Sequence, residues 1–405
     1  MNAQSDRIVE LRVRGMRTLA DVRLKLDGLT VLIGQNGTGK STLIEALELI
    51  RKFGASRDLE FALAQHYGLD ALLRAGQDQM TLGVSIEGAG PRIDYELSVG
   101  WRRPGQAGVL SEALDYHVQP GSIAPLHVIR RTTSRTLVYM PALAGERARL
   151  VEPDDAAEPG QLELHGSGTH PAIIRMRRAL NELAIHTPFD VRALWLEREL
   201  ATRSSMRYPV EIAPADRLER SGRNLANAMH ALLQGNSEQR EPLLGLLRLG
   251  LGADLIDVAT PAVQTGFIQL VFRFDRRPEL RLPLSQLSDG QLTFLGFVAL
   301  TALHHRGLLA FDEPEVHLHP SLIGRIVDLL EQSAQRAPVL LTTHSDRLLD
   351  FLESPAESIV LCELDATGAT RLLRPRQAEL SSWLERYRFG ELRAAGYAGL
   401  VFAES

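Results

Sequence analysis

The stretch GQNGTGKS, residues 34–41, decides the fold of this 405-residue chain. It fits the pattern G-x-x-x-x-G-K-[ST], in which two glycines, a lysine and a serine or threonine hold fixed positions. Those positions are taken by Gly34, Gly39, Lys40 and Ser41. The apolar run LTVLI (29–33) precedes the pattern, and apolar residues recur at helical spacing after it until Gly54. The sequence therefore predicts a strand, a glycine-rich turn and a helix around a phosphate-binding loop.

The residue types of this loop suit phosphate chemistry. Glycines let backbone N–H groups curl around phosphate oxygens, and the start of the helix adds the positive end of its dipole. We expect Lys40 to reach the outer phosphates as a solvent-facing side chain, and the Ser41 hydroxyl to bind Mg²⁺. The predicted nucleotide contacts are Gly34, Asn36, Gly37, Thr38, Gly39, Lys40, Ser41 and Thr42. A glycine turn that merely caps a helix is the competing interpretation, which the strand-to-helix setting disfavours.

Composition excludes several classes of protein. With 44% apolar and 23% charged residues, the chain resembles an ordinary folded protein of two to three domains. Its single cysteine, Cys362, excludes an intramolecular disulfide and a cysteine-based zinc site, so a reducing, cytoplasmic location is expected. No apolar run approaches the roughly 20 residues of a membrane span. A net charge of -5 gives no general attraction to nucleic acid, so DNA contact would need a local basic face.

Hydrophobic patterning divides the chain into three parts. The first part is rich in predicted strands, at 8–13, 22–26, 29–33, 81–88, 92–100 and 136–140. From about 146 to 255 the pattern is mostly helical. Strands return at 267–274 and 280–284, and the apolar strands 308–311 and 339–343 each follow a helical stretch. Strands that alternate with helices in this way predict a parallel sheet with crossover helices.

Three further motifs carry polar residues next to apolar runs. LLAF (308–311) leads into Asp312 and Glu313, which would lie at the carboxyl end of a strand, where α/β sheets bind ligands. Asp312 would then hold Mg²⁺ and Glu313 would polarise the attacking water. His344 ends the strand 339–343 and could contact a γ-phosphate, although a lone histidine there is usually only a satisfied polar residue.

LSDGQ (287–291) precedes a long apolar helix, and taken alone it needs no function. Ser288 is a plausible helix N-cap, with Gly290 in the turn. The order of the motifs changes this interpretation. The P-loop comes first and LSDGQ follows much later, then one helix, the strand with Asp312 and Glu313, a further helix, and the strand with His344.

That order resembles the Walker A, signature, Walker B and switch-histidine order of ABC-type ATPases. The GxNGxGKS loop and the run DEPEVHLHP (312–320) resemble the RecF/SMC-like branch, often labelled AAA-15/AAA-21 or OLD-like ATPases. The resemblance covers roughly residues 7–55 and 265–350 with specific motifs. It implies a P-loop α/β head with a mixed sheet, formed by residues 1–145 and 256–405, and an inserted helical lobe at 146–255.

The resemblance also implies a site shared between two chains. In this family the signature of one protomer closes over ATP held by the P-loop of the other, so Ser288, Gly290 and Gln291 would act in trans within a homodimer or larger assembly. Asp289 stands where the transporter-type LSGGQ has a glycine. The Q-loop glutamine has four candidates, Gln65, Gln77, Gln106 and Gln119, and the sequence singles out none. His317 and His319 would belong to the dimer-contact loop, with a metal site as the minor alternative.

The resulting expectation is an ATP-hydrolysing, dimerising switch with Lys40, Glu313 and His344 in catalytic roles and ATP and Mg²⁺ bound. Relatives act in DNA repair or phage defence, so a separate protein effector is expected and DNA is left open. A transporter subunit is disfavoured because about 250 residues separate the P-loop from LSDGQ. A non-hydrolysing scaffold is disfavoured by the presence of both Asp312 and Glu313. A fused nuclease would need more than the about sixty residues after His344, and residues 381–396 are expected to form a docking helix.

Overall fold

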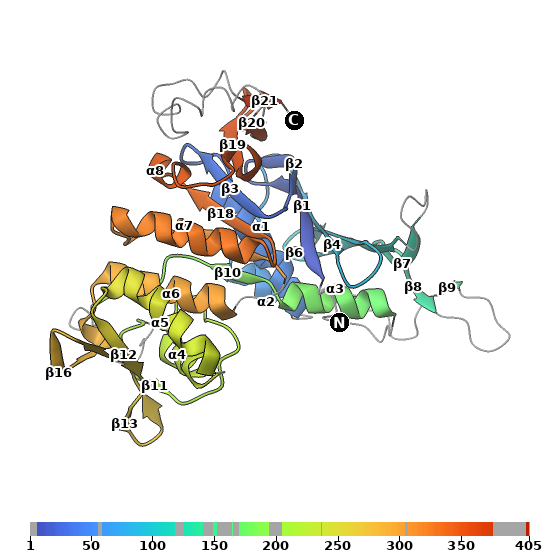
Figure 1. Cartoon of the computed structure of the whole chain (residues 1–405). Coiled ribbons are helices and arrows are strands. Elements are labelled where there is room, and N and C mark those ends of the chain that lie inside the picture. Colours follow the sequence, from blue (N-terminus) through green and yellow to red (C-terminus); the bar gives the residue numbers. More distant parts are fainter. Residues whose placement is uncertain are drawn as a thin grey trace.

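The computed structural model shows a layered α/β molecule with a smaller lobe at one side (Figure 1). It describes residues 6–55, 59–117, 125–140, 149–151, 164, 170–193, 205–235, 237–303, 307–375 and 402–404. The expected docking helix at 381–396 lies outside these residues. The mixed sheet and the helices that pack on it confirm the predicted α/β class.

A seven-stranded sheet forms the middle layer, in the order β10-β17-β18-β3-β19-β20-β21. Its first five strands are parallel, and β20 and β21 add antiparallel strands at one edge. The bounds are β10 (Ala184–His186), β17 (Leu309–Asp312), β18 (Val339–Thr343), β3 (Leu29–Gly34), β19 (Ile359–Leu364), β20 (Thr370–Pro375) and β21 (Phe402–Glu404). The phosphate-binding loop therefore leaves the centre of a parallel sheet.

Both faces of this sheet are buried, which explains why its strands read as continuous apolar runs. Along β3, Val31 and Ile33 face one hydrophobic core while Leu32 faces a second. The same alternation occurs in β17, where Leu309 and Phe311 face the first core. The side-chain period of two thus distributes each strand between two cores.

The second core lies between the parallel sheet and an eight-stranded antiparallel sheet, in the order β2-β1-β4-β5-β6-β7-β8-β9. The bounds are β1 (Arg7–Met16), β2 (Leu19–Lys25), β4 (Gln79–Glu87), β5 (Ile93–Arg103), β6 (Gln106–Tyr116), β7 (Leu126–Arg131), β8 (Thr136–Met140) and β9 (Arg149–Val151). Three helices border this core: α1 (Lys40–Ala55), α2 (Leu59–Ala64) and α3 (Pro171–Asn181).

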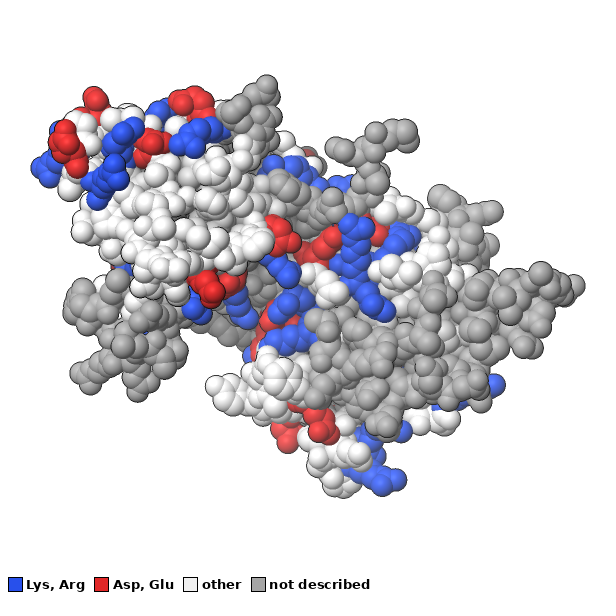
Figure 2. Space-filling view, turned by 90° about the horizontal axis from the view of Figure 1, so that it is seen from below, with Lys and Arg blue, Asp and Glu red and all other residues white. Residues whose placement is uncertain are grey.

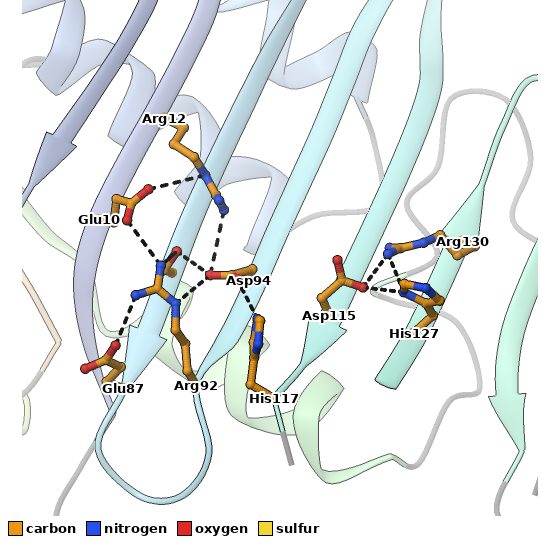
Figure 3. A network of polar contacts seen from close by, with 10 residues as sticks. Glu10, Arg12, Glu87, Arg92, Asp94, Asp115, His117, His127 and Arg130 are labelled. Atoms are coloured by element: carbon orange, nitrogen blue, oxygen red, sulfur yellow. Dashed lines mark hydrogen bonds and ion pairs between the residues drawn. The ribbon is translucent and has the colours of Figure 1, made fainter. Parts of the chain in front are cut away.

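Charged side chains on this second sheet pair with one another across its strands (Figure 3). Arg92 donates to Glu10, Glu87 and Asp94 at 3.0–3.1 Å. Burial raises the pKa of Asp94, but hydrogen bonds and the nearby arginine charges outweigh burial and leave that pKa below its ordinary value. These contacts join residues of neighbouring strands and tie this face of the sheet together.

The first core continues into the helices on the other side of the parallel sheet and into the lobe. The bounds here are α6 (Asp289–Leu303), α7 (Pro320–Ala334), α8 (Asp346–Leu349), α9 (Pro355–Ser358), α4 (Leu225–Gln234) and α5 (Ser237–Leu251). Two three-stranded sheets complete the lobe: β11 (Val210–Glu211), β14 (Phe267–Ile268) and β13 (Ala262–Gln264), and β12 (Leu255–Ala259), β15 (Val271–Phe274) and β16 (Arg277–Pro283). A 3₁₀ turn, Leu284–Gln286, leads from β16 into LSDGQ.

The lobe differs from the expected helical insertion 146–255 at both ends. Within that range, α3 borders the second core and β10 pairs in parallel with β17, so residues 171–186 belong to the head. At the other end, the strands up to Pro283 belong to the lobe sheets. The predicted strand 267–274 is two strands, β14 and β15, because the chain passes from one small sheet to the other.

The underside of the molecule is hollowed where the head meets the lobe. Figure 2 shows acidic and basic side chains gathered around this hollow, beside a largely uncharged surface. A cavity of about 780 Å³ lies there, lined by β10, the lobe loop 214–220 and the ends of α1 and α6. None of residues 34–42 lines it. Across the described parts of the chain, no helix is long and apolar enough to cross a membrane.

Candidate nucleotide site

The glycines of the loop after β3 are required by close contacts. A Cβ on Gly34 would lie 2.1 Å from the backbone oxygen of Cys362, in the neighbouring strand β19. Gly39 has φ +95°, and its Cβ would lie 2.5 Å from Thr370 Oγ1. Gly37, with φ +78°, has open space beside it. Two glycines thus let the loop fit against the sheet, and the third leaves its exposed tip free for a ligand.

Lys40 is buried, so the expectation of a solvent-facing side chain is wrong. Only 4% of the residue is exposed. Its Nζ donates to the backbone oxygens of Gly34 at 2.9 Å and Gln35 at 2.8 Å. The reason is that the loop curls over the start of α1 and its carbonyls point inward at the ammonium group. Lys40 therefore sets the shape of the loop and provides a positive charge inside it.

The remaining predicted loop contacts divide into two groups. Asn36 and Ser41 are exposed, whereas Thr38 and Thr42 are buried. Thr38 Oγ1 donates to the Gln35 oxygen at 2.8 Å and so closes the turn. α1 begins at Lys40, so the free N–H groups of its first turn follow directly on the loop, as an anion site at a helix start requires.

Asp312 ends β17 beside two hydroxyl groups. Ser41 Oγ donates to Asp312 Oδ1 at 3.2 Å, and Thr342 Oγ1 forms a short hydrogen bond to the same oxygen. Thr342 is the register partner of Asp312 in β18. A carboxylate and a serine hydroxyl within this distance fit the oxygen ligands that Mg²⁺ prefers. Sequence reasoning placed Ser41 and Asp312 together but gave Thr342 no role.

Glu313 adopts a left-handed backbone conformation with φ 53°, which is rare for a residue with a Cβ. Its N–H donates to the Thr342 backbone oxygen at 3.1 Å, and this bond fixes the turn. Glu313 Oε1 lies 3.2 Å from His344 Nε2, and both side chains are 37% exposed. The structure thus brings together two residues predicted to act in catalysis, Glu313 on the attacking water and His344 at the γ-phosphate.

Glu315 was missed by the sequence reasoning although it belongs to the quoted run DEPE. Its Oε1 accepts hydrogen bonds from Thr343 Oγ1 at 2.6 Å and from the His344 N–H at 3.1 Å. Glu315 therefore joins the loop after β17 to the loop after β18. The signal was a second carboxylate two residues after Glu313, on a loop that follows a buried strand.

The hollow beside the LSDGQ segment is lined by none of residues 34–42 and by none of residues 312–315. Ser288 and Gln291 form a capping box: Ser288 Oγ accepts from the Gln291 N–H at 3.3 Å, and Gln291 Oε1 accepts from the Ser288 N–H at 3.0 Å. Gly290 lies within the first turn of α6 and not before it, where we expected it. These residues line a hollow of about 760 Å³ with residues of α5 and of the loop before α7, but with none of residues 34–42.

His317 and His319 lie on the loop that borders this hollow. His319 is the N-cap of α7, where its Nδ1 accepts from the Ser321 N–H at 3.3 Å. His317 is exposed, with φ 66°. In the part of the chain that is described, no group of three or more histidine, cysteine or acidic side chains is placed to hold a metal. Of the Q-loop candidates, Gln65, Gln77 and Gln106 are exposed and Gln119 lies outside the described residues.

Comparison with known proteins identifies the family. Residues 29–350 match the family described as "AAA domain, putative AbiEii toxin, Type IV TA system". The chain is 24% identical to the Retron Ec83 probable ATPase of Escherichia coli over 371 residues, 80% of this chain and 65% of that protein. It is 31% identical to the DNA replication and repair protein RecF of Shewanella loihica over 94 residues, 23% of each chain. The chain thus spans just under two thirds of the retron protein and a quarter or less of RecF.

Two solved structures with a similar fold are SMC heads bound to domains of ScpA. One, bound to the C-winged helix domain, has a TM-score of 0.53 at 13% identity and covers 92% of this chain and 99% of its own. The other, bound to the C-terminal domain of ScpA derived from Pyrococcus furiosus, has a TM-score of 0.53 at 11% identity, with 94% and 99% covered. With the match over residues 29–350, they confirm the predicted resemblance: this chain belongs to the AAA-domain family and has the head fold of the RecF/SMC-like ATPases.

Proposed function

We propose that this protein is an ATP-hydrolysing switch that closes as a dimer around two Mg-ATP. Each nucleotide is held by the P-loop of one chain and covered by Ser288, Gly290 and Gln291 of the other. ATP closes the dimer, and hydrolysis opens it. One observation carries the proposal. The hollow beside LSDGQ includes no P-loop residue, so the P-loop half-site and the signature half-site of one chain do not share a pocket.

Each half-site lacks what the other provides. The P-loop offers N–H groups, the Lys40 charge and the Ser41–Asp312 pair, but its tip at Gly37 is open. The start of α6 offers a helix N-terminus that borders the hollow. Because residue 290 is a glycine, no side chain stands there between the helix backbone and the hollow. A helix N-terminus favours a phosphate, so a second copy of the P-loop with its nucleotide is the natural occupant.

The residues around Asp312 supply the parts that phosphoryl transfer needs. Bound Mg²⁺ would neutralise the phosphate charge, and Ser41 and Asp312 are the residues to hold it. Glu313 accepts a proton from the attacking water, while His344 at 3.2 Å orients the carboxylate. Positioning and electrostatics account for most of such catalysis, and these groups provide both.

A protein effector is the partner that the relatives support best. The family description names a toxin of a toxin–antitoxin system, and one relative is a retron ATPase. The SMC heads of similar fold are each bound to a protein domain. We therefore place this switch in defence or DNA maintenance, where the dimer state controls a separate protein. DNA is a second ligand for the closed dimer, as the RecF relative indicates.

Trapping the closed state tests the proposal. Glu313→Gln removes the group that accepts the proton but leaves Lys40, Ser41 and Asp312, so it should bind ATP normally and lose turnover by about 100-fold or more. Light scattering with ATP and Mg²⁺ should then show a dimer.

Glu363→Gln is the matched control, because Glu363 is an exposed glutamate of the same sheet, on strand β19. It should keep wild-type turnover and show no trapped dimer. A purely monomeric Glu313→Gln protein with ATP bound would refute the shared site.

A further inference from the structure

Arg207 is a buried arginine that binds the segment leading into LSDGQ. Its side chain is 7% exposed. Nη1 donates to the backbone oxygens of Ser285 at 2.8 Å and Leu287 at 2.7 Å, and Nη2 donates to Asp289 Oδ1 at 2.5 Å. One guanidinium group therefore contacts every second residue from 285 to 289, on both sides of Ser288.

The same side chain also reaches the chain that leaves the parallel sheet. Arg207 Nε donates to the Val191 oxygen at 2.9 Å. The flanking residues reinforce this contact, because the Met206 N–H donates to the Asp190 oxygen at 2.8 Å and Ser205 Oγ donates to the Arg192 oxygen at 2.8 Å. Residues 190–192 follow β10, which pairs with β17, the strand that ends in Asp312. Arg207 thus connects the signature to the sheet that carries the P-loop.

The arrangement explains why an aspartate at position 289 suits this site. In the transporter-type pattern this position is a glycine, but here its carboxylate is the charged partner of a buried guanidinium. The other acceptors of Arg207 are neutral carbonyl groups, which cannot balance its charge. A buried arginine requires a paired charge, so the aspartate and the arginine form a unit.

We propose that Arg207 is a positioning residue, which acts through Asp289 to hold Ser288, Gly290 and Gln291 in the orientation that meets a nucleotide on the partner chain. This inference rests on the proposed function, since it assigns Arg207 to the trans half-site. The contacts of Arg207 hold the Ser288–Gln291 capping box from outside α6, so the signature already has its binding conformation before the dimer closes.

The pair can be tested without disturbing the buried carbonyl groups. Arg207→Ala would leave three of them without this donor and would destabilise the lobe, so Asp289→Ala is the informative variant. Losing one charge-assisted hydrogen bond should lower kcat about tenfold, with little change in the affinity for ATP, because the binding P-loop is untouched. Arg207→Lys, which keeps the charge but loses the planar fork, should give a similar kcat loss.

Asp328→Ala is the matched control. Asp328 is 54% exposed against 55% for Asp289, and it also pairs with an arginine, but Arg325 is itself 53% exposed and 3.9 Å away. The control should retain wild-type kcat. Wild-type turnover in a folded Asp289→Ala protein would overturn the proposal.

Mixing experiments separate a signature defect from a general loss of stability. Asp289→Ala mixed with Lys40→Ala should regain activity, because one site of each heterodimer then has an intact P-loop and an intact signature. Asp289→Ala mixed with Ser288→Arg should not, since every site has a defective signature. If both mixtures regain activity, the role of Arg207 is overturned. The role is also overturned if neither mixture regains activity while Lys40→Ala mixed with Ser288→Arg does. If Lys40→Ala with Ser288→Arg also stays inactive, the trans site itself fails.

Discussion

The two halves of the proposed site are built in opposite ways. The P-loop half is assembled from distant parts of the chain: Gly34 lies against Cys362, Gly39 against Thr370, and Ser41 bonds Asp312. The signature half is more local, because Ser288 and Gln291 cap their own helix, and Arg207 binds the segment from outside that helix.

This contrast indicates which half of the site offers a free surface to a partner. The P-loop half is held by buried contacts, and its lysine is 4% exposed. The signature half ends at an open hollow. The first half should therefore determine ATP binding and stability, and the second should determine what happens when a partner arrives. Four predictions test this division, from the largest effect to the smallest.

Lys40→Ala should abolish measurable ATP binding, because the loop loses the positive charge that we propose binds the phosphates. Calorimetry against wild type measures this. The ammonium group also binds two loop carbonyls, so a loss of stability of about 1–3 kcal/mol is expected as well. Lys25→Ala removes an exposed lysine on β2 and should change neither property. Normal affinity in folded Lys40→Ala protein would refute the P-loop assignment.

Ser288→Arg should lose hydrolysis and keep ATP binding, because the long cation blocks only the surface that meets the partner's nucleotide. The lost cap costs about 1 kcal/mol, which a folded domain tolerates. Mixed with Lys40→Ala, it should recover part of the activity, since one site per heterodimer is intact. Persistent inactivity at every ratio, despite heterodimers that bind ATP, would contradict action in trans.

Gly34→Ala and Gly290→Ala should separate stability from turnover. An added Cβ at residue 34 meets a backbone oxygen at 2.1 Å, so the strands must move and stability falls by about 2–3 kcal/mol. At residue 290 the nearest atom, the His317 oxygen, is 3.3 Å away, and stability should change by less than about 1 kcal/mol. Thermal melts compare the two. Gly290→Ala should still lower turnover, and equal melting losses would break the contrast.

Cys362 should be almost inert to thiol reagents in the native protein. Burial raises the pKa of this thiol to about 12, only partly opposed by the charge of Lys40, so little thiolate exists at pH 8. Its alkylation should be on the order of a thousandfold slower than in denaturant. It should accelerate as pH rises towards the raised pKa.

A cysteine introduced as Ser288→Cys gives the comparison with the other half. It should react at an ordinary rate and become protected by ATP when combined with Glu313→Gln. Equal alkylation rates of the two thiols in the native protein would show that Cys362, which packs against Gly34, is not buried.

The P-loop half was predictable because its motifs have local signatures. A strand, GQNGTGKS and a helix fix the turn, and the rule that ligands bind at the carboxyl ends of parallel strands placed Asp312 near Ser41. The motif identified Lys40 as the lysine of the loop, but the expectation that its side chain faces solvent was wrong. A residue pattern does not show that the backbone carbonyls of Gly34 and Gln35 point inward.

Contacts between irregular segments could not be predicted. Arg207 follows no motif, and its partners are backbone oxygens about 80 residues away, which any sequence could provide. The strand β10 has three residues, too few for a period, and it follows directly on the helical pattern of α3. In β6 the neighbouring residues Gly108 and Val109 are both buried, which breaks the alternation that marks a strand.

The pairing of β3 has a consequence for how the protein is made. Leu29 pairs with Val339, so the strand that precedes the P-loop meets β18 only after more than 300 further residues have been synthesised. Most neighbours in the antiparallel sheet, by contrast, are consecutive in the chain and can pair as they emerge. Contacts so far apart form slowly. A chain that ends before residue 339 lacks both parallel neighbours of β3, the strands β18 and β19, and we therefore expect that it does not form the P-loop site.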